Sequence, residues 1–163
     1  MTSPDLTITD DYTGDLSESG PQRRTLGNAS IVKVSVGPMD NNVYIVTSTA
    51  TGDQLIIDAA NDADTILAAL AVIGGTPRTI FTTHQHYDHW QALADVAKAT
   101  GASTAAGRID APELPVQPDV LLDDGDALTV GDLHFDAIHL VGHAPGSIAL
   151  ALTDPATGVV HLF

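Results

Sequence analysis

Cysteine is absent from the 163-residue sequence, which excludes a disulfide framework, a thiolate nucleophile and a thiolate metal ligand. Basic residues are scarce: six Lys and Arg stand against 21 Asp and Glu, and the formal net charge is −15. A surface of that charge repels the phosphates of nucleic acids and the headgroups of anionic membranes. We therefore expect neither nucleic acid nor membrane as a partner.

Long apolar segments are also missing. The sequence contains no run of about 20 apolar residues, so it predicts no membrane-spanning helix. Residues 1–10 lack the basic segment followed by an apolar segment that marks a secretory signal. Together with the absence of cysteine, which fits a reducing compartment, these features predict a cytoplasmic protein.

The chain divides into two parts of different composition. Residues 1–29 are polar and predict an extended arm, with at most a short strand at residues 6–8. Residues 30–163 predict one folded domain, with a helix at 63–73 that Asp62 caps and a second helix at 91–100. Strands are predicted at 31–36, 43–46, 54–58, 78–83, 102–106, 127–130, 133–140, 147–152 and 158–163. This order predicts an α/β fold in which helices cover a mixed sheet.

One short run holds three of the seven histidines: His84, His86 and His89 lie within six residues, together with Asp88. Imidazole and carboxylate are ligands that zinc and iron accept. The run lies between a predicted strand and a predicted helix, at the strand end where open α/β sheets place ligand crevices. A polar surface loop is the alternative, but four potential ligands in six residues favour a metal site. We also expect Asp88 to start or cap the helix that follows.

A second histidine motif, His139-Leu-Val-Gly-His143-Ala-Pro-Gly-Ser147, lies between two predicted strands. Its glycine and proline residues predict a tight loop that leaves His143 at a strand end. Taken alone, His143 is equally well interpreted as a metal ligand and as an ordinary loop histidine. His134 and His161 alternate within strand-like runs and are interpreted as structural.

These motifs, in this order, resemble those of the metallo-β-lactamase superfamily, and most of all its glyoxalase II (hydroxyacylglutathione hydrolase) branch. Residues 42–46 resemble an early strand of the family, and residues 55–58 resemble its strand that ends in a structural aspartate, here Asp58. The resemblance spans residues 31–163. It implies an αββα sandwich, apparently truncated in its C-terminal half.

The resemblance also implies the ligands. His84, His86 and His143 would bind a first metal, and Asp88 and His89 a second. The implied cofactor is one or two zinc ions, with iron and manganese as alternatives. Three neutral imidazoles let a zinc-bound water ionise near pH 7, and Asp88 is the candidate to accept a proton after attack. Asp58 either orients a ligand or caps a loop.

The implied function is a metal-dependent hydrolase that acts on a thioester or a related small acyl compound. Two alternatives stay open: a mononuclear iron dioxygenase of persulfides, and a metal-binding fragment without catalysis. Tyr87 and Trp90 could wall the pocket, although core packing suits Trp90 better.

The chain also departs from the family pattern. Trp90-Gln91 and Leu140-Val141 stand where the family often has Gly-Gly and Thr-Pro. The family's bridging aspartate and a later histidine have no counterpart here. Residues 158–163 predict a buried apolar strand that ends abruptly. We therefore expect either a longer natural chain or a homo-oligomer that pairs this edge.

Overall fold

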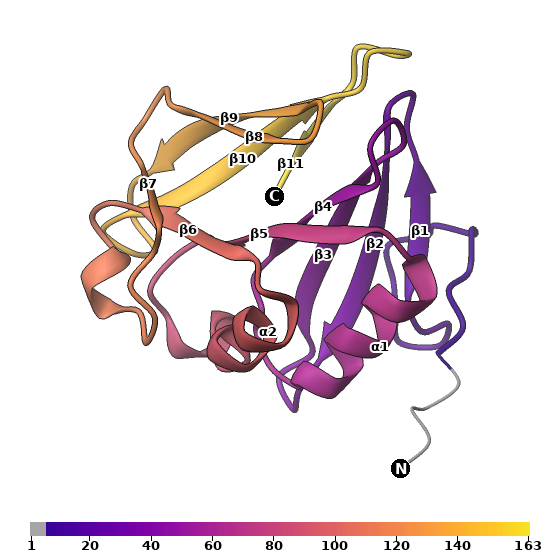
Figure 1. Cartoon of the computed structure of the whole chain (residues 1–163), viewed down its shortest axis with the longest axis horizontal. Helices are drawn as coiled ribbons and strands as arrows, with labels where there is room; N and C mark the ends of the chain where they lie inside the picture. The colour runs from indigo at the N-terminus through magenta and orange to yellow at the C-terminus, as the bar shows by residue number, and fades with distance from the viewer. Residues whose placement is uncertain (1–5) are drawn as a thin grey trace.

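Two β-sheets packed face to face make up most of the structure, a computed structural model that describes residues 6–163. Helices α1 (Ala63–Ile73) and α2 (Leu93–Thr100) lie on the outer face of the larger sheet (Figure 1). The α/β class and the two-sheet sandwich are thus confirmed. Over the outer face of the smaller sheet, residues 6–163 supply no helix, so three of the four implied layers are present.

The larger sheet has seven strands in sequence order, and its pairing changes halfway. The first four pair antiparallel: β1 (Gln22–Thr25), β2 (Ala29–Val36), β3 (Asn41–Ser48) and β4 (Asp53–Ile57). The last three continue parallel to β4: β5 (Thr76–Thr82), β6 (Ser103–Gly107) and β7 (Val120–Leu122). Helices α1 and α2 form the crossovers that parallel pairing requires. The carboxyl ends of β4, β5 and β6 therefore meet at one edge.

The smaller sheet is antiparallel, with the order β11-β10-β9-β8. Its strands are β8 (Ala127–Val130), β9 (Leu133–Leu140), β10 (Ser147–Thr153) and β11 (Val160–Leu162). The predicted strands at 127–130, 133–140 and 147–152 are confirmed. The prediction of a buried strand at 158–163 is wrong in its burial. The three residues of β11 form an edge strand in which Val160 and Leu162 are exposed.

Two hydrophobic cores follow from the alternation of side chains along the strands. Ile56 and Ile80 point to the helices and pack in a core with residues of α1 and α2. Leu55, Ile57 and Phe81 point to the other side and pack against the smaller sheet. The larger sheet is therefore buried on both faces, which explains the continuous apolar runs in β4 and β5.

Helix α1 begins as predicted. Asp62 is its N-cap, and its carboxylate accepts hydrogen bonds from the Thr65 amide (3.2 Å) and hydroxyl (2.7 Å). None of the helices in the described part of the chain is long and apolar enough to cross a membrane.

The prediction of a polar extended arm over residues 1–29 did not include the strand at residues 22–25, which form β1 and pair with β2. An edge strand needs few apolar side chains, so the polar sequence of β1 did not predict a strand. The strand predicted at residues 6–8 is also wrong, because only Thr9 forms an isolated bridge, with Gln22. A short strand that the sequence did not predict, β7, follows the proline-rich loop.

Candidate metal centre

Two loops that are distant in the sequence meet at one end of the sandwich. The first follows β5 and carries His84, His86, Asp88 and His89, and the second joins β9 to β10 and carries His143. The backbone itself ties the two loops together, because the amide of Ile148 donates to the carbonyl of Thr83 over 3.0 Å.

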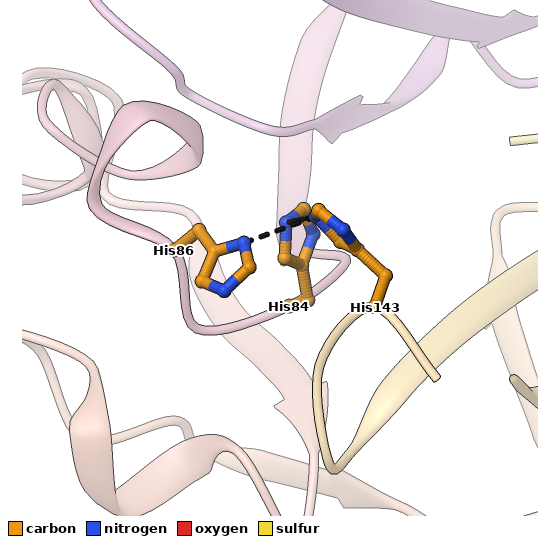
Figure 2. A group of neighbouring side chains, drawn as sticks. All are labelled: His84, His86 and His143. Carbon is orange, nitrogen blue, oxygen red and sulfur yellow. Dashed lines mark hydrogen bonds between the residues drawn. The ribbon is translucent and has the colours of Figure 1, made fainter. Parts of the chain in front are cut away.

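Three imidazole rings converge at this meeting point (Figure 2). His143 Nε2 lies 3.0 Å from His86 Nδ1 and 3.2 Å from His84 Nε2, and the three candidate ligand atoms all lie within 4.8 Å of one another. A tetrahedral zinc ion with bonds of about 2.0–2.1 Å separates its ligand atoms by about 3.3 Å. The donor atoms present therefore fit such an ion, and the predicted proximity of the three histidines is confirmed.

The three rings differ in burial. His84 is buried, His86 is half-buried and His143 is exposed. Burial is the main cause that lowers the pKa of His84, and the neighbouring His89 lowers it further. A lowered pKa favours the neutral imidazole, which is the form that binds metals. The exposed side at His143 leaves the group open to a water or a substrate.

Asp88 and His89 lie beside this trio. Asp88 Oδ2 is 3.6 Å from His89 Nε2, a separation that suits two ligands of one ion. A hydrogen bond from the Asn41 side-chain amide (2.9 Å) is the main cause that lowers the pKa of Asp88. The pKa of His89 is raised, chiefly by its hydrogen bond with Asp58.

The prediction that Asp88 caps α2 is wrong. Asp88 lies in a separate 3-10 turn, Tyr87–His89, and α2 begins only at Leu93 after the uncapped Ala92. The intervening backbone is held elsewhere, because the amide of Gln91 donates to Ala60 and that of Ala92 to Ala59. Asp88 is thus free to face the ligand cluster.

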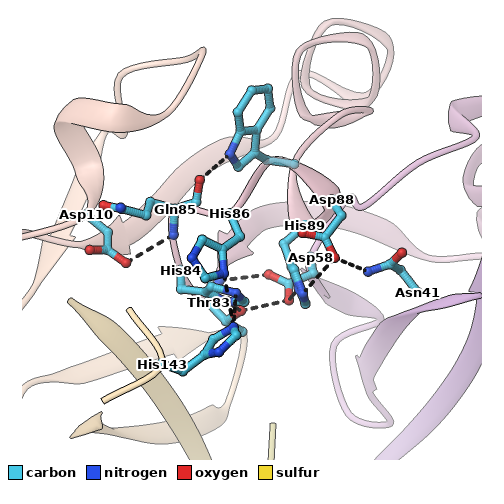
Figure 3. Close-up of polar contacts among 11 residues, drawn as sticks. Asn41, Asp58, Thr83, His84, Gln85, His86, Asp88, His89, Asp110 and His143 are labelled. Atoms are coloured by element: carbon cyan, nitrogen blue, oxygen red, sulfur yellow. Dashed lines mark hydrogen bonds and ion pairs between the residues drawn. The ribbon is translucent and has the colours of Figure 1, made fainter. Parts of the chain in front are cut away.

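Asp58 makes contacts that suit both roles that the sequence left open (Figure 3). Its buried carboxylate accepts the amide and hydroxyl of Thr83 at 2.7 and 2.8 Å, which fixes the start of the ligand loop. It also contacts His89 Nδ1 at 2.7 Å, which leaves Nε2 of that ring as the free nitrogen.

Asp110 is a site residue that the sequence did not reveal. Its side chain is buried, and Oδ2 accepts the amide of Gln85, between two candidate ligands, at 3.0 Å. A Cβ atom on Gly146, in the His143 loop, would lie only 2.7 Å from Asp110 Oδ1. The Asp110 side chain therefore lies between the two loops that carry the candidate ligands. Its position in a proline-rich segment of the sequence did not indicate this placement.

A cleft of about 570 Å³ opens beside the histidines. Its polar side includes Asn41, Thr83 and His89. Its apolar lining consists of Met39, Tyr44, Leu140, Val141, Ile148, Ala149 and Phe163.

Two aromatic side chains that were candidates for the pocket wall lie outside the cleft lining. Trp90 packs against the helix-side core and donates its indole N–H to the Gln85 carbonyl over 2.8 Å. Tyr87 is exposed, and its hydroxyl contacts the Met39 sulfur at 3.9 Å. Core packing is thus the role that the structure gives Trp90.

Fold and motif together define the class of protein. The chain belongs to the metallo-beta-lactamase superfamily, whose family model matches residues 36–162. The chain is 36% identical over 126 residues to a hydroxyacylglutathione hydrolase of Thermosynechococcus vestitus, an alignment that covers 73% of this chain and 46% of the relative. A second such hydrolase, from Cereibacter sphaeroides, is 33% identical over 115 residues, with 71% and 44% covered. The chain thus spans about half the length of these curated relatives.

Solved structures give the same fold. ETHE1 from Myxococcus xanthus superposes with a TM-score of 0.67 at 25% identity, over 75% of this chain and 53% of that one. BJP-1, a subclass B3 metallo-beta-lactamase of Bradyrhizobium japonicum, superposes with a TM-score of 0.70 at 25% identity, over 86% and 60%.

Proposed function

We propose that this chain is a metal-dependent hydrolase of small acyl compounds, with thioesters as the first substrates to test. The observation that carries the proposal is the convergence of His84, His86 and His143 at an open cleft. The similarity to hydroxyacylglutathione hydrolases supports the same class of reaction.

The three histidines are the proposed ligands of the first ion. A zinc ion held by three neutral imidazoles supplies a water with a pKa near 7 and polarises a carbonyl oxygen. Iron and manganese are the alternative metals, because the donor set contains only nitrogen and carboxylate oxygen.

Asp88 and His89 have two proposed roles that depend on occupancy. With two ions bound, both are ligands of the second ion. With one ion bound, Asp88 is the candidate to accept a proton from the attacking water, because its carboxylate lies beside the histidines and the hydrogen bond from Asn41 holds it in position. Asp58 acts through His89 and Thr83, whose positions it fixes.

The test is hydrolysis by zinc-loaded protein against a panel of thioesters, lactones and β-lactams. We expect cleavage of at least one thioester, and loss of both cleavage and one zinc equivalent in His84→Ala. His134→Ala is the matched control, because that ring is exposed on β9 and pairs only with Asp136. A zinc-loaded protein that cleaves none of the panel would instead support a binding function without catalysis.

The persulfide dioxygenase is the second candidate. It is favoured by the proximity of His84 and His143, whose Nε2 atoms lie 3.2 Å apart, because an iron site of this kind uses two histidines and one carboxylate. The aspartate that would complete this set has no counterpart in the sequence. Protein purified without added metal decides between the two. About one iron per chain with oxygen uptake on a persulfide supports the dioxygenase, and zinc without oxygen uptake excludes it.

A further inference from the structure

We propose that a polar groove next to the metal cleft binds the thiol arm of the substrate, which is the part of a thioester beyond its sulfur atom. Thioesters with a long, amide-bearing thiol arm are then preferred over those with a short one. This inference rests on the proposed hydrolase function and specifies its substrate class. The groove has a volume of about 610 Å³ and is lined by residues of β2, β3 and the segment 14–21.

The groove and the cleft share a wall. Asp40 and Asn42 line both of them. In the sheet, Asn42 of β3 pairs with Ser35 of β2, and Tyr44 of β3 pairs with Lys33 of β2. Paired residues direct their side chains to the same face, and Tyr44 packs against the core between the two sheets. These side chains therefore form one strip on the inner face of the larger sheet, which runs from the groove to the cleft.

The groove lies within reach of a substrate that occupies the cleft. Asp58, which contacts the candidate ligand His89, directly follows β4, and β3 and β2 are the next two strands of the sheet. Neighbouring strands are about 4.8 Å apart, so β2 lies roughly 10 Å from β4. A substrate arm of that length, extended across β3, reaches the side chains of β2.

The outer wall of the groove is fixed by a buried side chain. Gln22 is fully buried, and its amide group donates to the carbonyl of Asp15 (2.7 Å) and to the hydroxyl of Ser19 (2.6 Å), while its oxygen accepts the amide of Gly14 (2.8 Å). The ammonium of Lys33 donates to the Gly14 carbonyl over 2.6 Å. The segment that faces β2 and β3 is therefore held in place, and the groove is preformed, as binding sites usually are.

Several polar groups in the groove are available to a ligand. The side chain of Asn42 is exposed and has no hydrogen-bond partner among residues 6–163. One of the three N–H groups of Lys33 is used by Gly14, and the Ser35 hydroxyl donates to Asp40 over 3.3 Å. The side-chain amide of asparagine offers both a donor and an acceptor, which match the acceptor and the donor of a ligand amide. The groove therefore suits uncharged amide and hydroxyl groups.

The contrast between the groove and the cleft sets the orientation of the substrate. On the other side of the histidines, the cleft is lined by Leu140, Val141, Ile148 and Phe163. Apolar side chains suit the acyl group, and the polar groove suits an arm with amides. We therefore place the acyl group against these apolar residues and the thiol arm along the strip from Asn42 to Lys33.

A pair of thioesters of the same acid tests this placement. One carries N-acetylcysteamine, and the other carries pantetheine, which extends the same arm by roughly 7 Å, about the length of two amino-acid residues, and adds a second amide and hydroxyl groups. The reacting bond is the same and both arms are uncharged. The bound metal ion and the carboxylates of the site therefore act alike on the two compounds.

The measurement is kcat/KM of the zinc-loaded protein for each thioester. One or two added hydrogen bonds correspond to a preference of about five- to thirtyfold for the pantetheine thioester. Equal values, or a preference for the short arm, would overturn the inference and leave the hydrolase function in place.

A variant in the shared wall gives a second measurement. Asn42→Ala should lower the preference for the long arm several-fold, and only this ratio is diagnostic, because Asn42 also lines the cleft. Gln117→Ala is the matched control, since Gln117 is an exposed side-chain amide in the loop before β7, and it should leave both the ratio and the rates unchanged. An unchanged ratio in Asn42→Ala would mean that the arm binds elsewhere.

Binding without hydrolysis separates the groove from the reaction. The S-ethyl thioethers of pantetheine and N-acetylcysteamine cannot be hydrolysed, and their binding is measured from the backbone amide resonances of the zinc-loaded protein. We expect the pantetheine thioether alone to shift the resonances of Ser35 and Asn42. A protein that cleaves no acyl compound but shows these shifts would lack the hydrolase function and keep the groove as a binding site. No shift, or equal shifts with both thioethers, would overturn the inference.

Discussion

Asp58→Asn is predicted to disturb the metal site without disturbing the backbone. Asp58 has a φ of 57°, in the left-handed region that asparagine adopts as readily as aspartate. The new Oδ1 can still accept the Thr83 amide. The new amide group, however, presents a donor where the carboxylate presented an acceptor to His89 Nδ1 and to the Thr83 hydroxyl.

This reversal should change the tautomers of two rings. In the native protein the Thr83 hydroxyl donates to Asp58, so its oxygen can accept from His84 Nδ1, 2.9 Å away, and Nε2 of His84 stays free. His89 likewise donates through Nδ1 to Asp58 and keeps Nε2 free. With asparagine at position 58, His89 Nδ1 must accept from the new amide, and the Thr83 hydroxyl must donate to His84 Nδ1. The proton of each ring then moves to Nε2, which can no longer bind metal.

The expected magnitudes follow from the loss of charge-assisted hydrogen bonds to a buried carboxylate, which weaker bonds to a neutral amide replace. That loss costs about 1.5–3 kcal/mol of the free energy of unfolding, which lowers Tm by roughly 3–12 °C for a chain of this size. Loss of a residue that orients a ligand weakens metal binding by about 10–100-fold. Thermal unfolding of the metal-free protein, zinc competition with a chelator, and nitrogen NMR of the imidazoles measure the three effects.

Asp62→Asn is the matched control. Asp62 also has a left-handed φ, 48°, but it caps α1 away from the histidines, and asparagine caps helices about as well as aspartate. We expect less than about 1 kcal/mol of destabilisation and unchanged zinc affinity. If Asp58→Asn kept the native zinc affinity and the native His89 tautomer, Asp58 would have no orienting role.

Three further predictions concern other carboxylates. Asp110→Ala should cost about 1–3 kcal/mol of the free energy of unfolding, because it leaves the part-buried Gln85 amide without its acceptor, and it should weaken zinc binding. Asp110→Asn keeps an acceptor, so it should recover most of the stability and of the zinc affinity, as measured by unfolding and by competition with a chelator. Asp88→Asn should keep the fold but lower second-site metal binding and the rate of hydrolysis, and unchanged stoichiometry and rate would contradict its role. The hydrogen bond from the Gly27 amide is the main cause that lowers the pKa of Asp154 below 3.8. The ionised carboxylate therefore contributes fully to the free energy of unfolding above pH 3.8, and this contribution is lost as the pH falls through the lowered pKa. In Asp154→Asn, the free energy of unfolding measured with urea should depend less on pH in the acid range.

The sequence predicted the candidate ligands that lie close to one another in a single short segment. His84, His86, Asp88 and His89 are close in sequence, and the strand before them fixes where they lie. The interpretation of Asp58 came from the resemblance, in which an apolar strand is followed by a structural aspartate. The role of His143 came from the resemblance, since nothing in its own loop distinguishes a ligand from a surface histidine.

The contacts that the sequence did not predict depend on tertiary packing. Asn41 reaches Asp88 from β3, and Asp110 reaches Gln85 from a loop beyond β6. Neither residue lies near its partner in the sequence. The start of α2 was misplaced for a similar reason, because bonds from Gln91 and Ala92 to a distant loop hold the residues before it out of the helix.

The geometry of the three histidines depends on how closely the two sheets approach at β6. A Cβ atom on Gly107 of β6 would lie 2.6 Å from the Gly146 carbonyl oxygen and 2.8 Å from a side-chain carbon of Ile148. Glycine at this position therefore lets the turn that carries His143 pack directly on the larger sheet. The backbone hydrogen bond between Ile148 and Thr83 then fixes the position of that turn relative to the loop that carries His84 and His86. The 3.0 and 3.2 Å separations between the ring nitrogens are thus a consequence of sheet packing as much as of the histidines themselves.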